Sequence, residues 1–323
     1  MTEKTLLSVE GLTIGFNTEQ GPIRVVEDLN LSLAAGETLG IVGESGCGKS
    51  VTAQTLMRLL PSPPSRIDAG RILFEGEDLV TFSEKRMQKI RGDRIGMVFQ
   101  EPMTSLNPTQ RIGKQIAEVL VLHRGLSFGD AVGAVIEVLG KVGIGNAKRR
   151  LDQYPHELSG GLRQRVMIAM AIVCSPKLLI ADEPTTALDV TIQAQIMELL
   201  KSLQHDLGLA ILLITHDLGM VAEMSRNIAV MYAGRIVETG PAGAILGRPR
   251  HPYTAGLLNS SPRRAKKGDR LPSIPGLVPP PGHRGIGCSF ADRCERVTGR
   301  CRTELPPLMQ VGSQTVACWN PVP

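Results

Sequence analysis

A glycine-rich segment at residues 43–50, Gly-Glu-Ser-Gly-Cys-Gly-Lys-Ser, constrains the fold of this chain more than any other feature. A short apolar run precedes it at residues 39–42, and the residues that follow, 51–57, suit a helix. The spacing G-x-x-x-x-G-K-S between a buried strand and a helix is the pattern of a phosphate-binding loop. The backbone N–H groups of such a loop turn inward, and the helix dipole favours an anion at that end. The alternative is an ordinary strand-turn-helix connection that is rich in glycine.

This loop predicts a site for a nucleoside triphosphate. We expect the ammonium of Lys49 to reach the β- and γ-phosphates and the hydroxyl of Ser50 to ligate Mg²⁺. The remaining predicted contacts are the other loop residues and the first residue after them: Gly43, Glu44, Ser45, Gly46, Cys47, Gly48 and Val51.

Composition bounds the class of protein. A chain of 323 residues is long enough for two domains, and 42% hydrophobic against 21% charged residues is typical of a globular protein with a full core. Aromatic residues make up only 3%, which argues against stacking platforms for single-stranded nucleic acid. The net charge of +5 decides nothing about a partner. We therefore expect no nucleic-acid partner.

The sequence also carries information about location. No apolar run approaches the roughly 20 residues needed to span a bilayer. Residues 1–5 lead directly into an alternating segment and lack the apolar stretch of a signal peptide. We expect the chain to stay in the cytoplasm. There the six cysteines argue against disulfides and favour metal binding, catalysis or core packing.

Alternating patterns predict antiparallel strands. Apolar and polar side chains alternate over residues 6–33, and residues 70–79 and 228–238 each predict a hairpin. Phe16 is the only aromatic residue in the first strand, so it is the candidate to stack on an adenine ring. A place in the core is the alternative for Phe16.

Three further strands are predicted to end on polar side chains at one edge of a parallel sheet, where ligands bind. Residues 94–99 lead to Gln100, residues 177–181 lead to Asp182 and Glu183, and residues 211–215 lead to His216. We expect Gln100 to reach Mg²⁺ and the attacking water, Asp182 to hold Mg²⁺ through water, and Glu183 to orient and polarise that water. A solvated edge residue or a structural histidine is the alternative at each place.

A helical insertion is predicted inside this α/β pattern, because the periodicity becomes helical from residue 112 to about 151. The insertion leads to Leu158-Ser-Gly-Gly161. We expect Ser159 to cap a helix that starts near Leu162, with Gly160 and Gly161 leaving its first N–H groups unobstructed. This helix end is a second predicted anion site.

In this order the motifs resemble those of the ATP-binding subunit of ABC transporters, over residues 6 to about 250. The Ser-Gly-Gly element separates that family from other phosphate-loop NTPases. The local sequences at residues 101–108, 181–191 and 251–254 are similar to those of the dipeptide/oligopeptide importer branch. The resemblance implies an α/β fold with a mixed-sheet core, an antiparallel β subdomain and a helical subdomain at about residues 101–175. It also implies an ATPase domain over residues 1–250 and a small irregular C-terminal extension over residues 251–323.

The same resemblance implies a function, namely ATP hydrolysis with Mg²⁺ that powers uptake of di- or oligopeptides. Two ATPase subunits, non-identical in this branch, would sandwich two ATP molecules. Two transmembrane permeases and an extracytoplasmic solute-binding protein would complete the complex, with this chain peripheral on the cytoplasmic face of the inner membrane. Glu183, His216 and Gln100 would be catalytic. The ATP bound to the other subunit would be contacted in trans by Ser159, Gly160, Gly161 and Asp189.

The C-terminal extension has a distinct composition. A basic, proline-rich linker leads to four cysteines within 31 residues, spaced C-x5-C-x6-C-x16-C: Cys288, Cys294, Cys301 and Cys318. Four thiolates fit either Zn²⁺ or a [4Fe–4S] cluster, and the spacing leaves the metal open. The family resemblance, through Cys288-Ser-Phe-Ala-Asp-Arg-Cys294, favours an iron–sulfur site over zinc, with disulfides last.

Other readings stay open at this stage. An importer ATPase for another small solute, such as a nickel complex or glutathione, would carry the same motifs. A soluble ABC-type ATPase acting on nucleic acid or ribosomes usually has two ATPase halves or a long coiled-coil insertion, and this chain has neither. A GTPase would need an N-K-x-D element, which the sequence lacks.

Overall fold

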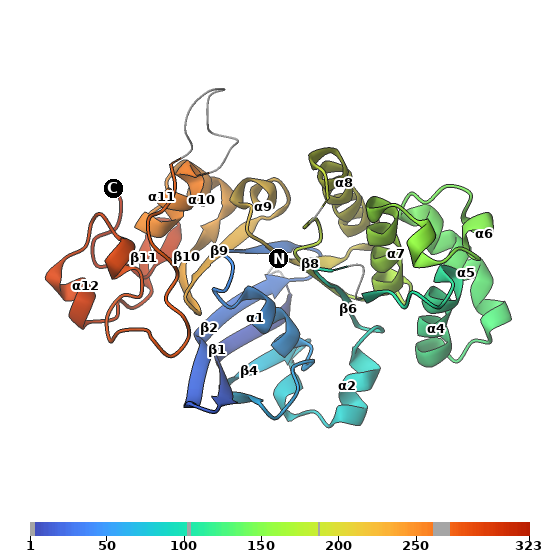
Figure 1. Ribbon diagram of the computed structural model, residues 1–323, viewed down its shortest axis with the longest axis horizontal. Coiled ribbons are helices and arrows are strands. Elements are labelled where there is room, and N and C mark those ends of the chain that lie inside the picture. The colour runs from blue at the N-terminus through green and yellow to red at the C-terminus, as the bar shows by residue number, and fades with distance from the viewer. Residues whose placement is uncertain (1–3, 102–104, 187, 261–271) are drawn as a thin grey trace. The chain divides into compact units, whose positions relative to one another are not determined.

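The computed structural model describes residues 4–101, 105–186, 188–260 and 272–323. The chain forms two compact units. Unit 1 comprises residues 1–34, 38–81 and 213–323, and unit 2 comprises residues 35–37 and 82–212. Strand β8 (Ala210–Thr215) contains the boundary between them. Figure 1 shows the course of the chain through both units.

The elements of unit 1 are mostly strands. They are β1 (Thr5–Thr18), β2 (Gly21–Ala34), β3 (Thr38–Val42), α1 (Lys49–Leu56), β4 (Ser65–Phe74), β5 (Glu77–Asp78), α9 (Leu218–Met224), β9 (Asn227–Tyr232), β10 (Arg235–Pro241), α10 (Ala242–Gly247), α11 (Pro252–Asn259), α12 (Gly299–Thr303), β11 (Met309–Val311) and β12 (Gln314–Val316). Short 3-10 turns cover Leu79–Thr81 and Ala291–Arg293.

One sheet of unit 1 is entirely antiparallel, in the order β2-β1-β4-β5, and Figure 1 shows its longer strands side by side. Its register follows the alternation of the sequence, because one set of alternate side chains, Leu12, Ile14, Leu29 and Ile72 among them, is buried on one face. The expected antiparallel subdomain and the hairpin at residues 70–79 are confirmed.

A second sheet of unit 1 is mixed. Strand β3 pairs with β9 in parallel, β9 pairs with β10 antiparallel, and β10 is followed by β12 and β11. The hairpin from β9 to β10 turns at Ala233 and Gly234, whose φ angles of 43° and 78° are both left-handed. The predicted hairpin at residues 228–238 is therefore confirmed.

The C-terminal residues are more regular than expected. Glu238 and Thr239 of β10 pair with Val316 and Thr315 of β12, so the tail extends the mixed sheet of unit 1 by a small hairpin. Val316 and Gln314 are buried in this arrangement. The sequence signal was weak because each strand is only three residues long.

Unit 2 is mostly helical. Its elements are α2 (Glu84–Ile90), β6 (Ile95–Val98), α4 (Ile112–Arg124), α5 (Phe128–Lys141), α6 (Ala147–Arg150), a 3-10 turn (Pro155–Glu157), α7 (Gly160–Ile172), β7 (Leu178–Asp182) and α8 (Val190–Leu207). Strands β6 and β7 pair in parallel, and helices α4, α5 and α7 pack on one another. Helices α4, α5 and α6 lie where the periodicity predicted a helical insertion, from residue 112 to about 151.

Among the described residues, no single helix is both long and apolar enough to cross a bilayer. Helices α4 and α5, bent by 116° at their break, meet the length and composition requirement only as a pair.

Candidate functional site

The phosphate loop of unit 1 lies between β3, whose five residues are all buried, and helix α1. Glycine is required at two of its positions for different reasons. A Cβ atom on Gly43 would lie 2.2 Å from the carbonyl oxygen of Met231, so only glycine fits there. Gly48 is the N-cap residue of α1 with a φ of 109°, a left-handed conformation that side chains disfavour. The loop therefore turns tightly into a helix N-terminus.

The ammonium of Lys49 is buried, with the residue 4% exposed, and it bends back over this loop. Its Nζ atom donates to the carbonyl oxygens of Gly43 at 2.8 Å and Glu44 at 3.1 Å. Gly48, the N-cap residue of α1, has no side chain that could bond to the first N–H groups of the helix. The Lys49 ammonium and the N–H groups at the start of α1 together favour binding of an anion.

In unit 2, the parallel strands β6 and β7 bring Gln100 and Glu183 together, as the sequence predicted. Val98 is paired with Ala181, so the residues that follow each strand leave the sheet at the same edge. The amide Nε2 of Gln100 donates to Oε2 of Glu183 at 3.2 Å, and the hydroxyl of Thr186 donates to the same oxygen at 2.8 Å. Glu183 is 8% exposed and Asp182 3% exposed. Two buried carboxylates thus end strand β7.

The backbone of Glu183 is strained. Its φ is 46°, in the left-handed region where a residue with a Cβ is uncommon. Strain of this kind costs about 1–3 kcal/mol and persists where the surroundings fix it, typically at functional sites. The conformation turns the Glu183 side chain toward Gln100 and Thr186. Sequence reasoning did not foresee Thr186, although it lies in the same segment.

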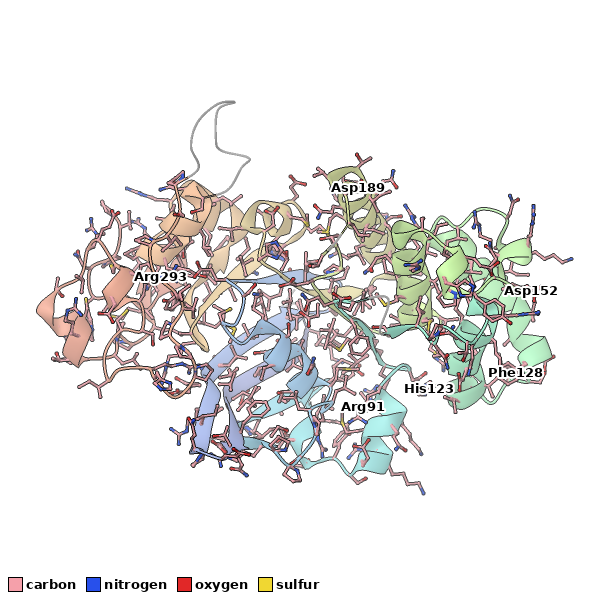
Figure 2. All side chains as sticks on the ribbon, in the orientation of Figure 1. Arg91, His123, Phe128, Asp152, Asp189 and Arg293 are labelled. Carbon is pink, nitrogen blue, oxygen red and sulfur yellow. The ribbon has the colours of Figure 1, made fainter. Side chains whose placement is uncertain are left out.

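The Ser-Gly-Gly element starts helix α7. The helix begins at Gly160 rather than near Leu162, and Ser159 occupies the N-cap position without a side-chain capping bond. The expected capping by the Ser159 hydroxyl is therefore wrong, and both Ser159 and Gly160 are exposed. A Cβ on Gly161 would lie 2.8 Å from Cγ2 of Ile192, so the glycine lets α7 approach α8 closely. Asp189, labelled in Figure 2, caps α8 by accepting from the N–H of Ile192 at 2.9 Å.

Two other predicted residues lie in unit 1. Phe16 is half-buried in β1, opposite Ile23 of β2 and Ser65 of β4. His216 is exposed and follows directly after β8. The next residue, Asp217, caps α9 by accepting from the N–H of Met220.

The C-terminal cysteines do not form the predicted metal centre. All four are free thiols, and within the described residues no group of three or more histidine, cysteine or acidic side chains is arranged to hold a metal ion. Burial raises the pKa of Cys288, Cys294 and Cys318, for Cys318 to about 11. The sulfur of Cys301 lies 3.3 Å from the hydroxyl of Thr298. The predictions of a [4Fe–4S] cluster, of Zn²⁺ in its place and of a metal-binding extension are therefore wrong.

Two residues that contact the phosphate loop were not predicted from the sequence. The backbone N–H of Glu44 donates to the hydroxyl oxygen of Tyr253 at 2.8 Å, and the Glu44 carboxylate is paired with Arg293. The basic linker that was expected around Arg263–Arg270 lies outside the described residues. Tyr253 lies in the 251–254 segment and Arg293 between two cysteines, so both fell within noticed motifs whose role was unknown.

Comparison with known proteins agrees with this geometry. Residues 26–186 match the model of the ABC transporter family, and residues 237–301 match the model described as the C-terminal region of oligopeptide/dipeptide transporters. A protein of Brucella ovis named as a peptide import ATP-binding protein is 51% identical over 322 residues, covering 96% of this chain and 95% of its own length. A protein of Sinorhizobium fredii named as a peptide ABC transporter ATP-binding protein is 50% identical, covering 98% of this chain and 95% of its own length.

Solved structures support the fold. The protein cbiO1 of Clostridium perfringens, described as part of the ABC transporter complex cbiONQ, is 31% identical with a TM-score of 0.65, covering 76% of this chain and 92% of its own. The bacterial ABC transporter cassette MJ0796, solved as a dimer, is 28% identical with a TM-score of 0.65, covering 73% and 98%. The predicted fold class and ATPase activity are confirmed, and ATP and Mg²⁺ are the cofactors that the family implies. The chain belongs to the ABC transporter family, as an ATP-binding subunit with the C-terminal region of oligopeptide/dipeptide transporters.

Proposed function

We propose that this subunit powers the import of short peptides. The observation that carries the proposal is the match of residues 237–301 to the C-terminal region of oligopeptide/dipeptide transporters, together with relatives near 50% identity that are named for peptide import. The same architecture would serve an importer of a nickel complex or of glutathione, because cargo is selected by other subunits. Peptide import is the function that the matched region supports best.

The residues of the loop suit ATP with Mg²⁺. Lys49 would bind the β- and γ-phosphates, and the positive φ angles at Gly46 and Gly48 aim the loop backbone inward. The Ser50 hydroxyl, Gln100 and Asp182 offer the hard oxygen donors that Mg²⁺ prefers, and this ion needs only one or two protein carboxylates beside phosphate and water. The bound ion would neutralise charge on the phosphates.

Glu183 is the residue we assign to activating water. Its carboxylate is fixed by hydrogen bonds from Gln100 and Thr186, so its orientation is set before substrate arrives. It would accept a hydrogen bond from the attacking water and polarise it, while Gln100 holds the carboxylate and His216 contacts the γ-phosphate. Phe16 would stack on the adenine.

The partners follow from the family. We infer a second, non-identical ATPase subunit, whose bound ATP would be contacted by Ser159, Gly160, Gly161 and Asp189 of this chain. The exposed N-terminus of α7 supports this, since an uncapped helix end is available to an anion from outside. Two permease subunits and an extracytoplasmic solute-binding protein would complete the importer, placing this chain on the cytoplasmic face of the membrane. The division at residue 250 between an ATPase domain and an extension stays a prediction.

Reconstitution tests the cargo. The chain is combined in proteoliposomes with the second ATPase, permeases and solute-binding protein encoded beside it, and uptake of labelled dipeptide, oligopeptide, glutathione and nickel complex is compared. We expect ATP-dependent uptake of peptide alone, and none with Glu183→Gln. Uptake of nickel or glutathione instead of peptide would contradict the proposal. ATP-dependent association of Glu183→Gln with the second ATPase tests the inferred pairing.

A further inference from the structure

A clamp from the C-terminal region holds the second residue of the phosphate loop. The guanidinium of Arg293 (labelled in Figure 2) donates from Nη1 to Oε2 of Glu44 at 2.6 Å and from Nη2 to Oε1 at 3.0 Å, across 249 residues of sequence. Parallel paired bonds of this kind fix the carboxylate in orientation as well as in position. The N–H of Glu44 donates to the Tyr253 hydroxyl oxygen at the same time. Both the side chain and the backbone of Glu44 are thus held from the C-terminal side of the chain.

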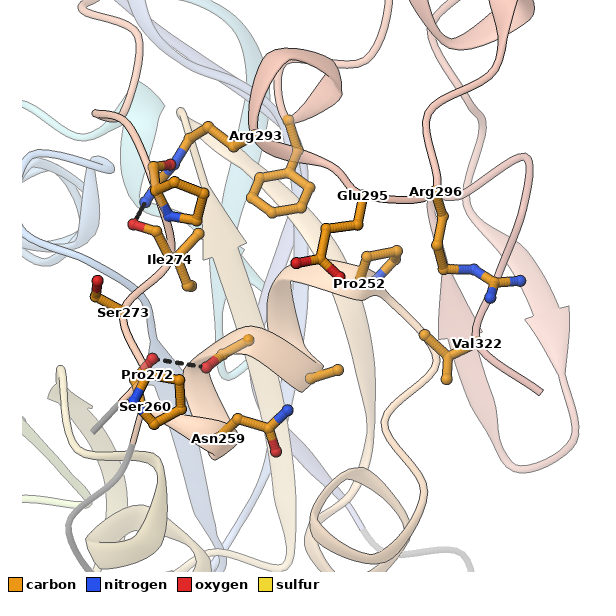
Figure 3. Close-up of a pocket in the computed structure, with 14 residues that line it drawn as sticks. Pro252, Asn259, Ser260, Pro272, Ser273, Ile274, Arg293, Glu295, Arg296 and Val322 are labelled. Atoms are coloured by element: carbon orange, nitrogen blue, oxygen red, sulfur yellow. Dashed lines mark hydrogen bonds between the residues drawn. The ribbon is translucent and has the colours of Figure 1, made fainter. Parts of the chain in front are cut away.

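Arg293 is itself immobilised. Its side chain is only 5% exposed. Nε donates to the carbonyl oxygen of Pro275 at 2.8 Å, Nη2 also to that of Ile274 at 3.3 Å, and Nη1 also to the Tyr232 hydroxyl at 3.3 Å. With the two bonds to Glu44, these use all five donors of the guanidinium. Figure 3 shows Arg293 beside Ile274 in the wall of a pocket formed by α11 and the C-terminal segment.

An aromatic cluster supports the clamp. Tyr232, at the end of β9, lies 4.6 Å from Tyr253 and 5.2 Å from Phe290 between ring centroids. Tyr253 and Phe290 are 5.5 Å apart. All three rings are buried, and such pairs contribute packing energy beyond their buried area. The groups that contact Glu44 are therefore anchored in a packed aromatic cluster.

The contact between Arg293 and Glu44 extends to Lys49, the residue expected to bind phosphate. The carbonyl oxygen of Glu44 accepts from Nζ of Lys49 at 3.1 Å, so Arg293, Glu44 and Lys49 form one continuous chain of contacts. The Glu44 side chain is 30% exposed, and its negative charge lies within the loop that must receive a polyanion. Without a neutralising cation this carboxylate would repel the phosphates and attract the ammonium of Lys49.

We propose that Arg293 is a positioning residue for ATP binding, because it cancels the charge of Glu44 and fixes the orientation of the phosphate loop. This inference rests on the proposed function only in that the loop binds ATP. The C-terminal region then contributes to the nucleotide site through Arg293.

The test measures the Kd of Mg-ATP by calorimetry on the purified full-length chain, which is independent of any cargo. We expect Arg293→Ala to weaken binding by about tenfold to a hundredfold, as an unneutralised charge near the phosphates would. Removing the charge as well, in Glu44→Gln/Arg293→Ala, should recover most of the lost affinity. Arg296→Ala is the matched control, because Arg296 lies in the same segment and its guanidinium donates to Asn320 and Pro321. The control should leave Kd unchanged.

A conservative cycle covers the case in which Arg293→Ala fails to fold. Arg293→Lys keeps a cation but loses the paired geometry, so it should weaken ATP binding by about fivefold in the native background and by much less beside Glu44→Gln. Unchanged affinity in both Arg293 variants would overturn the proposal. Equal weakening with and without the Glu44 carboxylate would also overturn it, because Arg293 would then act through general packing. If the Kd values for Mg-ATP follow these expectations but peptide uptake in proteoliposomes fails, only the proposed cargo is rejected.

Discussion

The amide of Gln100 donates a hydrogen bond to Oε2 of Glu183 at 3.2 Å, joining the ends of two parallel strands 83 residues apart in sequence. Thr186 donates to the same oxygen. These two donors fix Oε2 and with it the orientation of the Glu183 carboxylate. The carboxylate is therefore already oriented in the absence of nucleotide.

Glu183→Gln should therefore abolish turnover while retaining nucleotide. The amide keeps the size of the side chain but cannot accept a proton or polarise water as a carboxylate does, and a positioned base contributes about 10²–10⁴-fold. We expect kcat for ATP hydrolysis to fall by at least about a hundredfold. Phosphate release measured on the assembled transporter checks this. Glu198→Gln, an exposed position on α8, is the control and should hydrolyse ATP normally; a Glu183→Gln subunit that retains most of its kcat would contradict the assignment.

The meeting of Gln100 with Glu183 could be predicted from sequence because each residue directly follows an apolar strand, and parallel strands end at the same edge of a sheet. The phosphate loop was equally legible, since its strand, glycines and helix are contiguous. In both cases the information lies within a few residues of the site.

The contact between Arg293 and Glu44 could not be predicted in this way. The two residues are 249 positions apart in sequence. Arg293 lies in a C-terminal region whose strands are only three residues long, so no hydrophobic periodicity indicates how that region packs. The four cysteines misled for a related reason, because their spacing indicates a cluster but does not determine where the sulfur atoms point. Ser159 does occupy the N-cap position of α7, but its hydroxyl makes no capping bond, a rotamer-level detail that the sequence does not determine.

Stability should depend on pH through His251. This residue is 1% exposed, its Nδ1 accepts from the N–H of Tyr253 at 3.1 Å, and burial lowers its pKa from 6.5 to about 3. Between these two values the unfolded chain binds a proton that the folded chain does not, so the free energy of unfolding falls as pH falls, by about 1.4 kcal/mol per pH unit. His251→Asn keeps an acceptor at the N-cap of α11 but cannot titrate.

Chemical denaturation between about pH 5 and 6.5 measures this slope. As pH falls, the free energy of unfolding should fall more steeply for the native chain than for His251→Asn. The difference between the two slopes should correspond to about one bound proton. The neighbouring Glu238, whose N–H donors include that of His251, has a pKa raised by burial and contributes with the opposite sign in both proteins. Equal slopes for the two proteins would rule out His251 as the titrating group.

The close approach of α7 to α8 predicts a specific rescue. Gly161→Ala would place its new methyl group 2.8 Å from Cγ2 of Ile192, so one side chain must move, and overpacking of this kind costs about 1–3 kcal/mol. Gly161→Ala/Ile192→Ala should be more stable than the sum of the two single changes predicts, since the second change removes the clash. Thermal unfolding of all four proteins measures the coupling, and strict additivity would mean that the helices separate easily.

Gly43→Ala should be the most damaging single change in the loop. Its methyl carbon would lie 2.2 Å from the carbonyl oxygen of Met231, a backbone atom of the adjacent strand β9 that cannot rotate away. The loop must then shift, which carries with it the carbonyl oxygen that holds Lys49. We expect loss of measurable ATP binding and a lower melting temperature. Gly133→Ala is the matched control, because that glycine lies within α5 with nothing inside 4 Å of the new methyl group, and it should stabilise the chain by about 1 kcal/mol. ATP affinity that survives Gly43→Ala would show that the loop can adapt without its first glycine.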